Sequence, residues 1–148
     1  MSEHLRLLRF YFWILALFTL GRWGLGFGGA EYAKVHHVFS LVILSLIAAA
    51  HHAAFARAFA GYNLKRAVAL GALVGLSTQL VIFVSTALSY LLGLNTFFNA
   101  PAALNATEPV AFGAAMGARA FGLVVNTILN VIAALIGYAM GGALPRKV

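Results

Sequence analysis

Apolar residues occupy four long stretches of this chain, separated by short segments rich in glycine, asparagine, proline or basic residues. The stretches cover approximately residues 7–27, 35–60, 67–92 and 113–140. Each is close to or above the roughly 20 residues that a helix needs to cross the hydrocarbon core of a bilayer. We therefore predict an all-α integral membrane protein, a single domain over residues 1–148 built as a bundle of four transmembrane helices.

The composition fits a surface that faces lipid over most of its area. Of the 148 residues, 63% are hydrophobic and 9% are charged, whereas about a quarter of the residues of soluble domains are charged. The net charge of +7 would suggest nucleic acid for a soluble protein, but here the basic residues lie at the ends of the apolar stretches. We expect the lipid bilayer as partner, with anionic headgroups near these basic ends, and no nucleic acid.

The basic residues also predict an orientation. With four spans, the two termini and the turn between the second and third stretches share one side of the membrane. That side holds seven basic residues, which are Arg6, Arg9, Arg57, Lys65, Arg66, Arg146 and Lys147. The other side holds Arg22, Lys34 and Arg119, and Arg119 can snorkel to the interface from the start of its helix. Because cytoplasmic loops are enriched in Lys and Arg, we expect both termini in the cytoplasm, segment 95–111 outside, and a bacterial inner membrane as the location.

The second stretch carries four of the five histidines, as the pairs His36/His37 and His51/His52. On one continuous helix, His37 and His51 would fall within about 40° of one face and lie about 21 Å apart along the axis. That separation would let one helix ligate two stacked haems, one near each leaflet, because neutral imidazole is a good axial ligand of haem iron. His37 and His51 are therefore candidate ligands for haem b.

This spacing is similar to that of the dihaem b-type cytochromes, in which histidine pairs on two helices clamp each haem. The likeness covers one helix, since no other predicted span contains a histidine. It implies that a bis-histidine site would need the same helix from a second copy across a two-fold axis, or a histidine from another subunit.

Two other interpretations of the histidines stay open. His36 and His52 are candidate ligands of copper or zinc, although the chain lacks the i, i+3 or i+4 spacing that metal sites on helices use. Alternatively, the imidazoles are interfacial or hydrogen-bonded within the bundle. The absence of cysteine excludes thiolate metal sites, iron–sulfur clusters and disulfides.

Polar and small residues in the third and fourth stretches favour a different function. Gln79, Asn126 and Asn130 lie within apolar stretches, where amides need to face protein or a wet cavity. They predict a polar path, which four helices can enclose only as an oligomer. The small residues expected at helix contacts are Gly71, Gly75, Gly122, Gly137 and Gly141.

Stand-alone catalysis is not expected from this chain. It contains no aspartate, and its three glutamates (Glu3, Glu31 and Glu108) lie at or outside the ends of the spans, so no carboxylate could orient a Ser–His pair. Three functions remain. The first is a subunit of an oligomeric, redox-related membrane assembly with a histidine-ligated haem or metal. The alternatives are a small oligomeric transporter or channel, and a structural or assembly subunit with no ligand.

Overall fold

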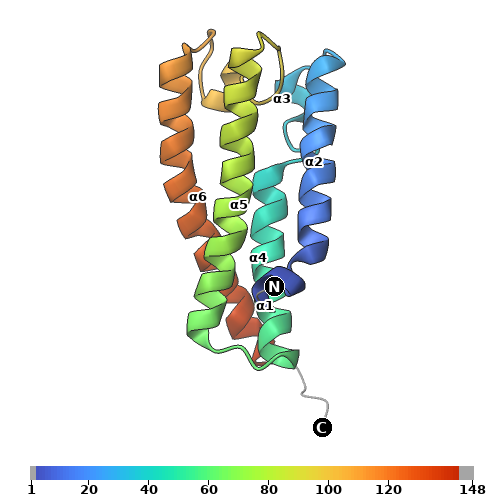
Figure 1. The fold of residues 1–148 in the computed structure, drawn as a ribbon, viewed down its shortest axis with the longest axis vertical. Helices are drawn as coiled ribbons and strands as arrows, with labels where there is room; N and C mark the ends of the chain where they lie inside the picture. Colours follow the sequence, from blue (N-terminus) through green and yellow to red (C-terminus); the bar gives the residue numbers. More distant parts are fainter. Residues whose placement is uncertain (1–2, 144–148) are drawn as a thin grey trace.

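The computed structural model describes residues 3–143, and these form helices and connecting loops with no strand. In chain order the elements are α1 (Glu3–Leu7), α2 (Arg9–Phe27), α3 (Tyr32–Val35), α4 (Leu41–Phe59), α5 (Leu64–Leu91), the short 3₁₀ helix η1 (Pro101–Leu104) and α6 (Phe112–Gly141) (Figure 1). Among the described residues, four helices are long and apolar enough to cross a membrane: α2, α4, α5 and α6. The prediction of an all-α chain with four helices of membrane-spanning length is confirmed.

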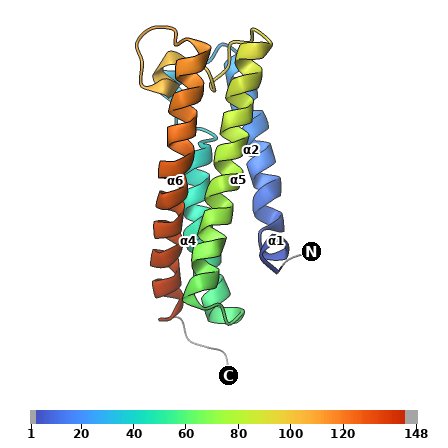
Figure 2. The same cartoon turned by 60° about the vertical axis from the view of Figure 1, so that its left-hand side comes forward.

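The long helices run alongside one another and define two ends of the bundle. At the turn end lie α1, the α4–α5 connection and the C-terminal end of α6 (Figure 1). At the loop end lie segments 28–40 and 92–111, which include α3 and η1. Figure 2 shows α5 and α6 side by side along the bundle, with α2 at its edge.

Glycines bring α6 into close contact with two neighbouring helices. A Cβ atom added at Gly71 would lie 2.8 Å from the carbonyl oxygen of Asn130, and one at Gly75 would lie 2.8 Å from the Cα of Thr127. Nearer the C-terminal end of α6, Cβ atoms at Gly137 and Gly141 would overlap the backbone of Ala50 and Ala54 on α4, respectively. Helix α6 therefore touches both α4 and α5 backbone to backbone, a packing that only small residues permit.

Helix α2 packs through large side chains instead. The Tyr11 hydroxyl is hydrogen-bonded to Thr78 and lies 3.3 Å from the carbonyl oxygen of Val74 on α5. Further along, the Trp23 indole nitrogen donates to Ser85 over 3.4 Å. The opposite side of α2 exposes large apolar side chains, among them Phe10 and Trp13, each 72% exposed. An outer face of this kind suits contact with lipid.

Helix α4 begins at Leu41, which corrects the predicted start of the second stretch near residue 35. Residues 36–39 form a turn, and Phe39 adopts a left-handed φ of 51° while its ring packs against Phe18 and Gly21. Ser40 then caps the new helix, its hydroxyl accepting from the Ile43 amide at 3.4 Å. With 19 residues, α4 is about 28 Å long, while the 30-residue α6 is about 45 Å long. The N-terminus of α4 consequently lies inside the bundle, below the loop end.

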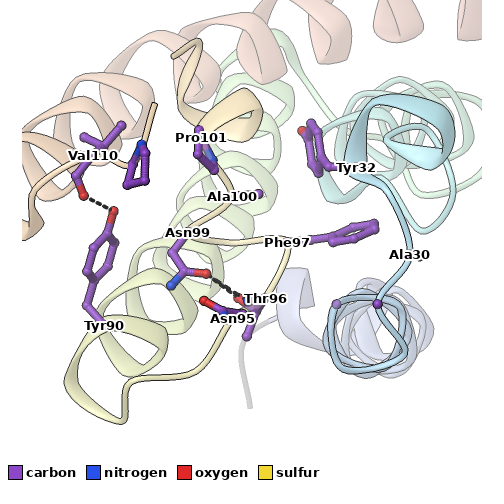
Figure 3. Close-up of a pocket in the computed structure, with 13 residues that line it drawn as sticks. Ala30, Tyr32, Tyr90, Asn95, Thr96, Phe97, Asn99, Ala100, Pro101 and Val110 are labelled. Carbon is purple, nitrogen blue, oxygen red and sulfur yellow. Dashed lines mark hydrogen bonds between the residues drawn. The ribbon is translucent and has the colours of Figure 1, made fainter. Parts of the chain in front are cut away.

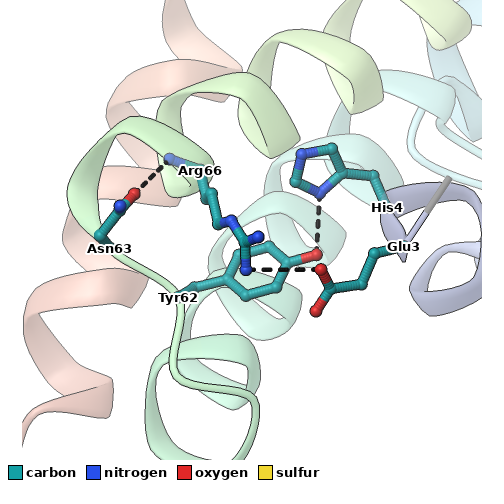
Figure 4. Close-up of polar contacts among 5 residues, drawn as sticks. All are labelled: Glu3, His4, Tyr62, Asn63 and Arg66. Carbon is teal, nitrogen blue, oxygen red and sulfur yellow. Dashed lines mark hydrogen bonds and ion pairs between the residues drawn. The ribbon is translucent and has the colours of Figure 1, made fainter.

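A polar cluster fastens α1 to the turn end (Figure 4). His4 Nδ1 lies 2.8 Å from the Tyr62 hydroxyl, and Glu3 forms a 3.4 Å ion pair with Arg66. Asn63 caps α5 by accepting from the Arg66 amide at 3.0 Å. Tyr62 is buried beneath this cluster, with 3% of its surface exposed.

Candidate functional site

Two arginines from different helices line one cavity near the loop end. The cavity has a volume of about 200 Å³ and opens above the start of α4. We call it the arginine pocket. Its lining residues are Arg22, Tyr32, His36, Ser40, Leu41, Val42, Ile82, Phe98, Ala103 and Arg119. Its charged residues are both cationic, and no carboxylate lines it.

Arg22 is buried among neutral groups. It is 8% exposed, and its guanidinium donates to the carbonyl oxygen of His36 over 3.2 Å. Its central carbon lies 5.5 Å from the ring centre of Tyr32, 5.6 Å from that of Phe97 and 5.8 Å from that of Phe98. These aromatic faces attract a cation, but they carry no negative charge to neutralise it.

Arg119 reaches the same pocket from α6. Its Nε donates to Thr86 Oγ1 at 3.1 Å, and one terminal nitrogen donates to the carbonyl oxygen of Phe98 at 2.8 Å. Arg119 was expected to snorkel to the interface, but these bonds turn its guanidinium inward. Both of its partners are neutral, as are those of Arg22.

No glutamate of this chain neutralises the two arginines. Within residues 3–143, the ion pairs are those of Glu31 with Lys34, at 2.6 Å, and of Glu3 with Arg66. Glu108 is exposed in segment 92–111, and the chain has no aspartate. Because a buried charge without a counter-charge is costly, the pocket is suited to hold an anion.

The N-terminus of α4 adds to the positive electrostatic potential that Arg22 and Arg119 create in the pocket. Leu41 and Val42 line the pocket and precede the first intrahelical hydrogen bond, from the Leu44 amide to the Ser40 carbonyl oxygen. Amides at a helix start and the helix dipole both favour an anion. A helix that starts inside a bundle and points its N-terminus at an anionic group is a recurring arrangement in membrane transporters.

A larger neutral cavity adjoins the arginine pocket at the loop end (Figure 3). Its volume is about 500 Å³, and Tyr32 lines both cavities. Two hydrogen bonds connect residues that line this cavity. Tyr90 donates to the carbonyl oxygen of Val110 at 2.6 Å, and Asn99 accepts from the Thr96 amide at 2.9 Å. None of its lining residues is charged, so the positive potential is concentrated in the smaller pocket.

The histidines do not adopt the arrangement predicted for haem ligands on one helix. His37 is exposed in the turn before α4, whereas His51 is exposed on α4. Because α4 begins at Leu41, the angle and the 21 Å separation expected for a continuous helix do not apply to His37 and His51.

The candidate metal ligands His36 and His52 are also apart. His36 lines the arginine pocket, and its Nδ1 lies 3.1 Å from the carbonyl oxygen of Ala33. His52 is half-buried in α4, with its Nδ1 2.9 Å from the carbonyl oxygen of Ala48. Over the part of the chain that the structure describes, no three His, Asp or Glu side chains are grouped closely enough to hold a metal ion.

The predicted polar stripe lies mostly between helices. Gln79 and Asn130 are buried at the α5–α6 contact, and Asn126 is half-buried. The Asn130 side-chain amide donates to the carbonyl oxygen of Asn126 at 2.8 Å, and that of Asn126 donates to Gly122 at 2.9 Å. These two hydrogen bonds stay within α6, whereas Gln79 Nε2 and Asn130 Oδ1 are buried without a hydrogen-bond partner among the described residues. Gly122 has room around it, since the nearest atom to an added Cβ is Asn126 Nδ2 at 3.6 Å.

Comparisons of the chain with protein-family models, curated proteins and solved structures found no match. The site therefore rests on geometry alone. From the sequence, Arg22 and Arg119 were used only to predict the orientation in the membrane. That they line one cavity was not predicted. One signal was present in the sequence: both arginines belong to apolar stretches that contain no acidic residue.

Proposed function

We propose that this protein crosses a membrane four times, with both termini in the cytoplasm, and binds a compact anion in the arginine pocket. The anion belongs to the carboxylate or phosphate class, because a guanidinium matches the paired oxygens of either group. The observation that carries this proposal is the convergence of Arg22 and Arg119 on one cavity without a carboxylate. A bacterial inner membrane remains the proposed location.

The distribution of charge supports the orientation. Arg22, Lys34 and Arg119 belong to the loop end, whereas the remaining basic residues of the described chain belong to the turn end. An outer location for the loop end follows from the enrichment of Lys and Arg in cytoplasmic segments. The arginine pocket would then open toward the outer leaflet.

The proposal is tested by ³¹P line broadening of inorganic phosphate mixed with the detergent-purified chain. We expect the wild type to broaden the phosphate signal saturably and Arg119→Gln to abolish most of the effect. Lys34→Gln is the matched control, because Lys34 carries the same charge at the same end but pairs with Glu31. Equal broadening by wild type and Arg119→Gln would contradict the proposal.

A second candidate function rests on the place of His51. Ile43, Ile47, His51 and Phe55 recur every four residues on the exposed side of α4, so they share one face. An imidazole on a lipid-facing stripe is costly, which favours a face covered by a second copy of the chain or by another membrane subunit. Such an oligomer could share a haem b between His51 of two copies.

The absorption spectrum of the purified protein tests this second candidate. A Soret band with reduced α and β bands, lost in His51→Ala and retained in His52→Ala, supports a shared haem. A spectrum without these bands in protein purified from haem-replete cells would contradict it and leave the anion pocket unaffected.

A further inference from the structure

Arg119 also lines a second cavity on the outer side of α6. This cavity, which we call the α6 crevice, has a volume of about 300 Å³ and lies between η1 and α6. Ala118, Phe121, Val125 and Asn126 are among its lining residues, and Phe121 is 72% exposed. Arg119 and Ala103 line both the crevice and the arginine pocket. One guanidinium thus separates a cationic pocket from a mainly apolar crevice on the surface of the bundle.

The depth of Arg119 matches that of a lipid headgroup. Arg119 lies seven residues after Phe112, so it sits about 10 Å below the end of α6. With α6 upright and centred in the bilayer, a helix of about 45 Å extends roughly 7 Å beyond each side of a hydrocarbon core about 30 Å thick. The Cα of Arg119 would then lie about 3 Å inside the edge of the core, where the headgroup region begins. At this level, the guanidinium that Thr86 and Phe98 hold inside the bundle lies close to the headgroup region.

The crevice provides the space that a lipid chain needs. The backbones of α5 and α6 touch at Gly71 and Gly75, whereas a Cβ atom at Gly122 would make only ordinary contacts, 3.6 Å from Asn126 Nδ2 and 3.9 Å from Gln79 Oε1; the space itself is the crevice of about 300 Å³. The lining on this side of α6 is largely apolar, with Ala118, Phe121 and Val125 next to the single cation Arg119. A soluble anion would gain nothing from this apolar crevice, because it has no apolar surface to bury there. The acyl chain of a phospholipid would bury apolar surface in it.

We propose that the anion of the arginine pocket is the phosphate of an anionic phospholipid. Its headgroup binds between Arg22 and Arg119 near the N-terminus of α4, and its acyl chain lies in the α6 crevice beside Ala118 and Val125. This inference rests on the proposed function of the pocket and names its ligand class. The occupant is selected by charge, since the pocket contains two arginines and no carboxylate, and by an adjoining crevice that shares Arg119 and Ala103 with the pocket.

Thermal unfolding of the full chain in a neutral detergent tests the inference. Three probes are compared: dioctanoyl phosphatidic acid, dioctanoyl phosphatidylcholine and inorganic phosphate. We expect phosphatidic acid to raise Tm saturably, with an apparent affinity at least tenfold higher than that of inorganic phosphate. Phosphatidylcholine, which has no net charge, should have little effect.

A matched pair of variants separates the crevice from the pocket. Ala118 and Ala120 are both exposed on α6, on either side of Arg119 in the sequence, but only Ala118 lines the crevice. Ala118→Trp should reduce the affinity for phosphatidic acid about tenfold and leave that for inorganic phosphate unchanged. Ala120→Trp should bind both probes as the wild type does.

The possible failures are distinguishable. Equal affinity for phosphatidic acid and inorganic phosphate, or equal effects of Ala118→Trp and Ala120→Trp, would overturn the lipid inference while the anion pocket stands. Stabilisation by phosphatidylcholine equal to that by phosphatidic acid would also overturn it. If no anionic probe acts on the wild type, both the inference and the proposed function fail.

Discussion

Arg22 of α2 and Arg119 of α6 line the same cavity, although they lie near opposite ends of the chain. Arg22 donates to the carbonyl oxygen of His36, and Arg119 donates to that of Phe98 and to Thr86. Neutral oxygens hold both guanidinium groups in place, and aromatic rings surround that of Arg22, without neutralising either charge. This relationship distinguishes the pocket from an internal salt bridge and supports the proposal that it binds a negative charge from outside the chain.

The close approach of α4 and α6 predicts that Gly137 is the least replaceable position on α6. In Gly137→Ala the new Cβ would lie 2.7 Å from the Cα of Ala50, so the helices must separate. Overpacking of this kind typically costs about 1–3 kcal/mol, and we expect a lower Tm in thermal unfolding. Gly117→Ala is the control, because a Cβ there meets nothing within 4 Å. Equal Tm values for the two variants would contradict the packing described for α4 and α6.

The proposed orientation predicts which ends of the bundle react with an impermeant reagent. The chain contains no cysteine, so single cysteines can be introduced at the exposed positions Thr107 and Lys65. With both termini in the cytoplasm, Thr107→Cys should react with a membrane-impermeant maleimide in intact cells. Lys65→Cys should react only after permeabilisation, and the opposite pattern would reverse the orientation.

The turn-end cluster predicts a loss of stability at alkaline pH. Burial of Tyr62, followed by the negative charge of Glu3, raises the pKa of the Tyr62 phenol above its usual value of 10.0. The folded state therefore favours the neutral phenol, and the stability that Tyr62 contributes is fully present below pH 10 and is lost as the pH rises through its folded pKa.

Unfolding measured between pH 9 and pH 11.5 tests whether stability falls as the pH rises. We expect the free energy of unfolding to fall more steeply with pH in the wild type than in Tyr62→Phe, which has no phenol to ionise. Tyr62→Phe should also be less stable near neutral pH, because it loses the hydrogen bond to His4. Parallel curves for the two proteins would show that Tyr62 does not titrate differently in the folded state.

Two arginine substitutions should not act independently if both groups hold one anion. We expect Arg22→Gln and Arg119→Gln each to remove most of the stabilisation by phosphate, and the double variant to lose little more. A double-mutant cycle measures this coupling, since residues that share a partner deviate from additivity by about 0.5–3 kcal/mol. Fully additive losses would indicate two separate weak sites.

The existence of four long helices was predictable because the length of an apolar stretch follows directly from the thickness of a bilayer. The break before α4 was not predicted from the stretch 35–60, in which Val35, Val38 and Phe39 are as apolar as the helix that follows. The break depends on the ring of Phe39 packing over Gly21, a contact between distant segments. Ser40 was the local signal, as its hydroxyl is suited to cap a helix.

The candidate site depended even more on tertiary contacts. The spacing of Gly71 and Gly75 predicted a close helix contact, but it did not identify Thr127 and Asn130 as the residues on the other side. Arg22 and Arg119 were interpretable only as charges near helix ends, because no local pattern relates α2 to α6. A chain with three glutamates and ten basic residues nevertheless leaves most of its cations without an internal acidic partner.

The measurement that tests the central claim most directly is thermal unfolding with and without inorganic phosphate at constant ionic strength. At a concentration one hundred times its Kd, phosphate should stabilise the wild type by about 2.7 kcal/mol and leave the Arg22→Gln/Arg119→Gln variant unchanged. Arg6→Gln/Arg9→Gln is the control, because it removes the same charge from exposed positions near the turn end. Stabilisation of the Arg22→Gln/Arg119→Gln variant equal to that of the wild type would contradict an anion site between Arg22 and Arg119.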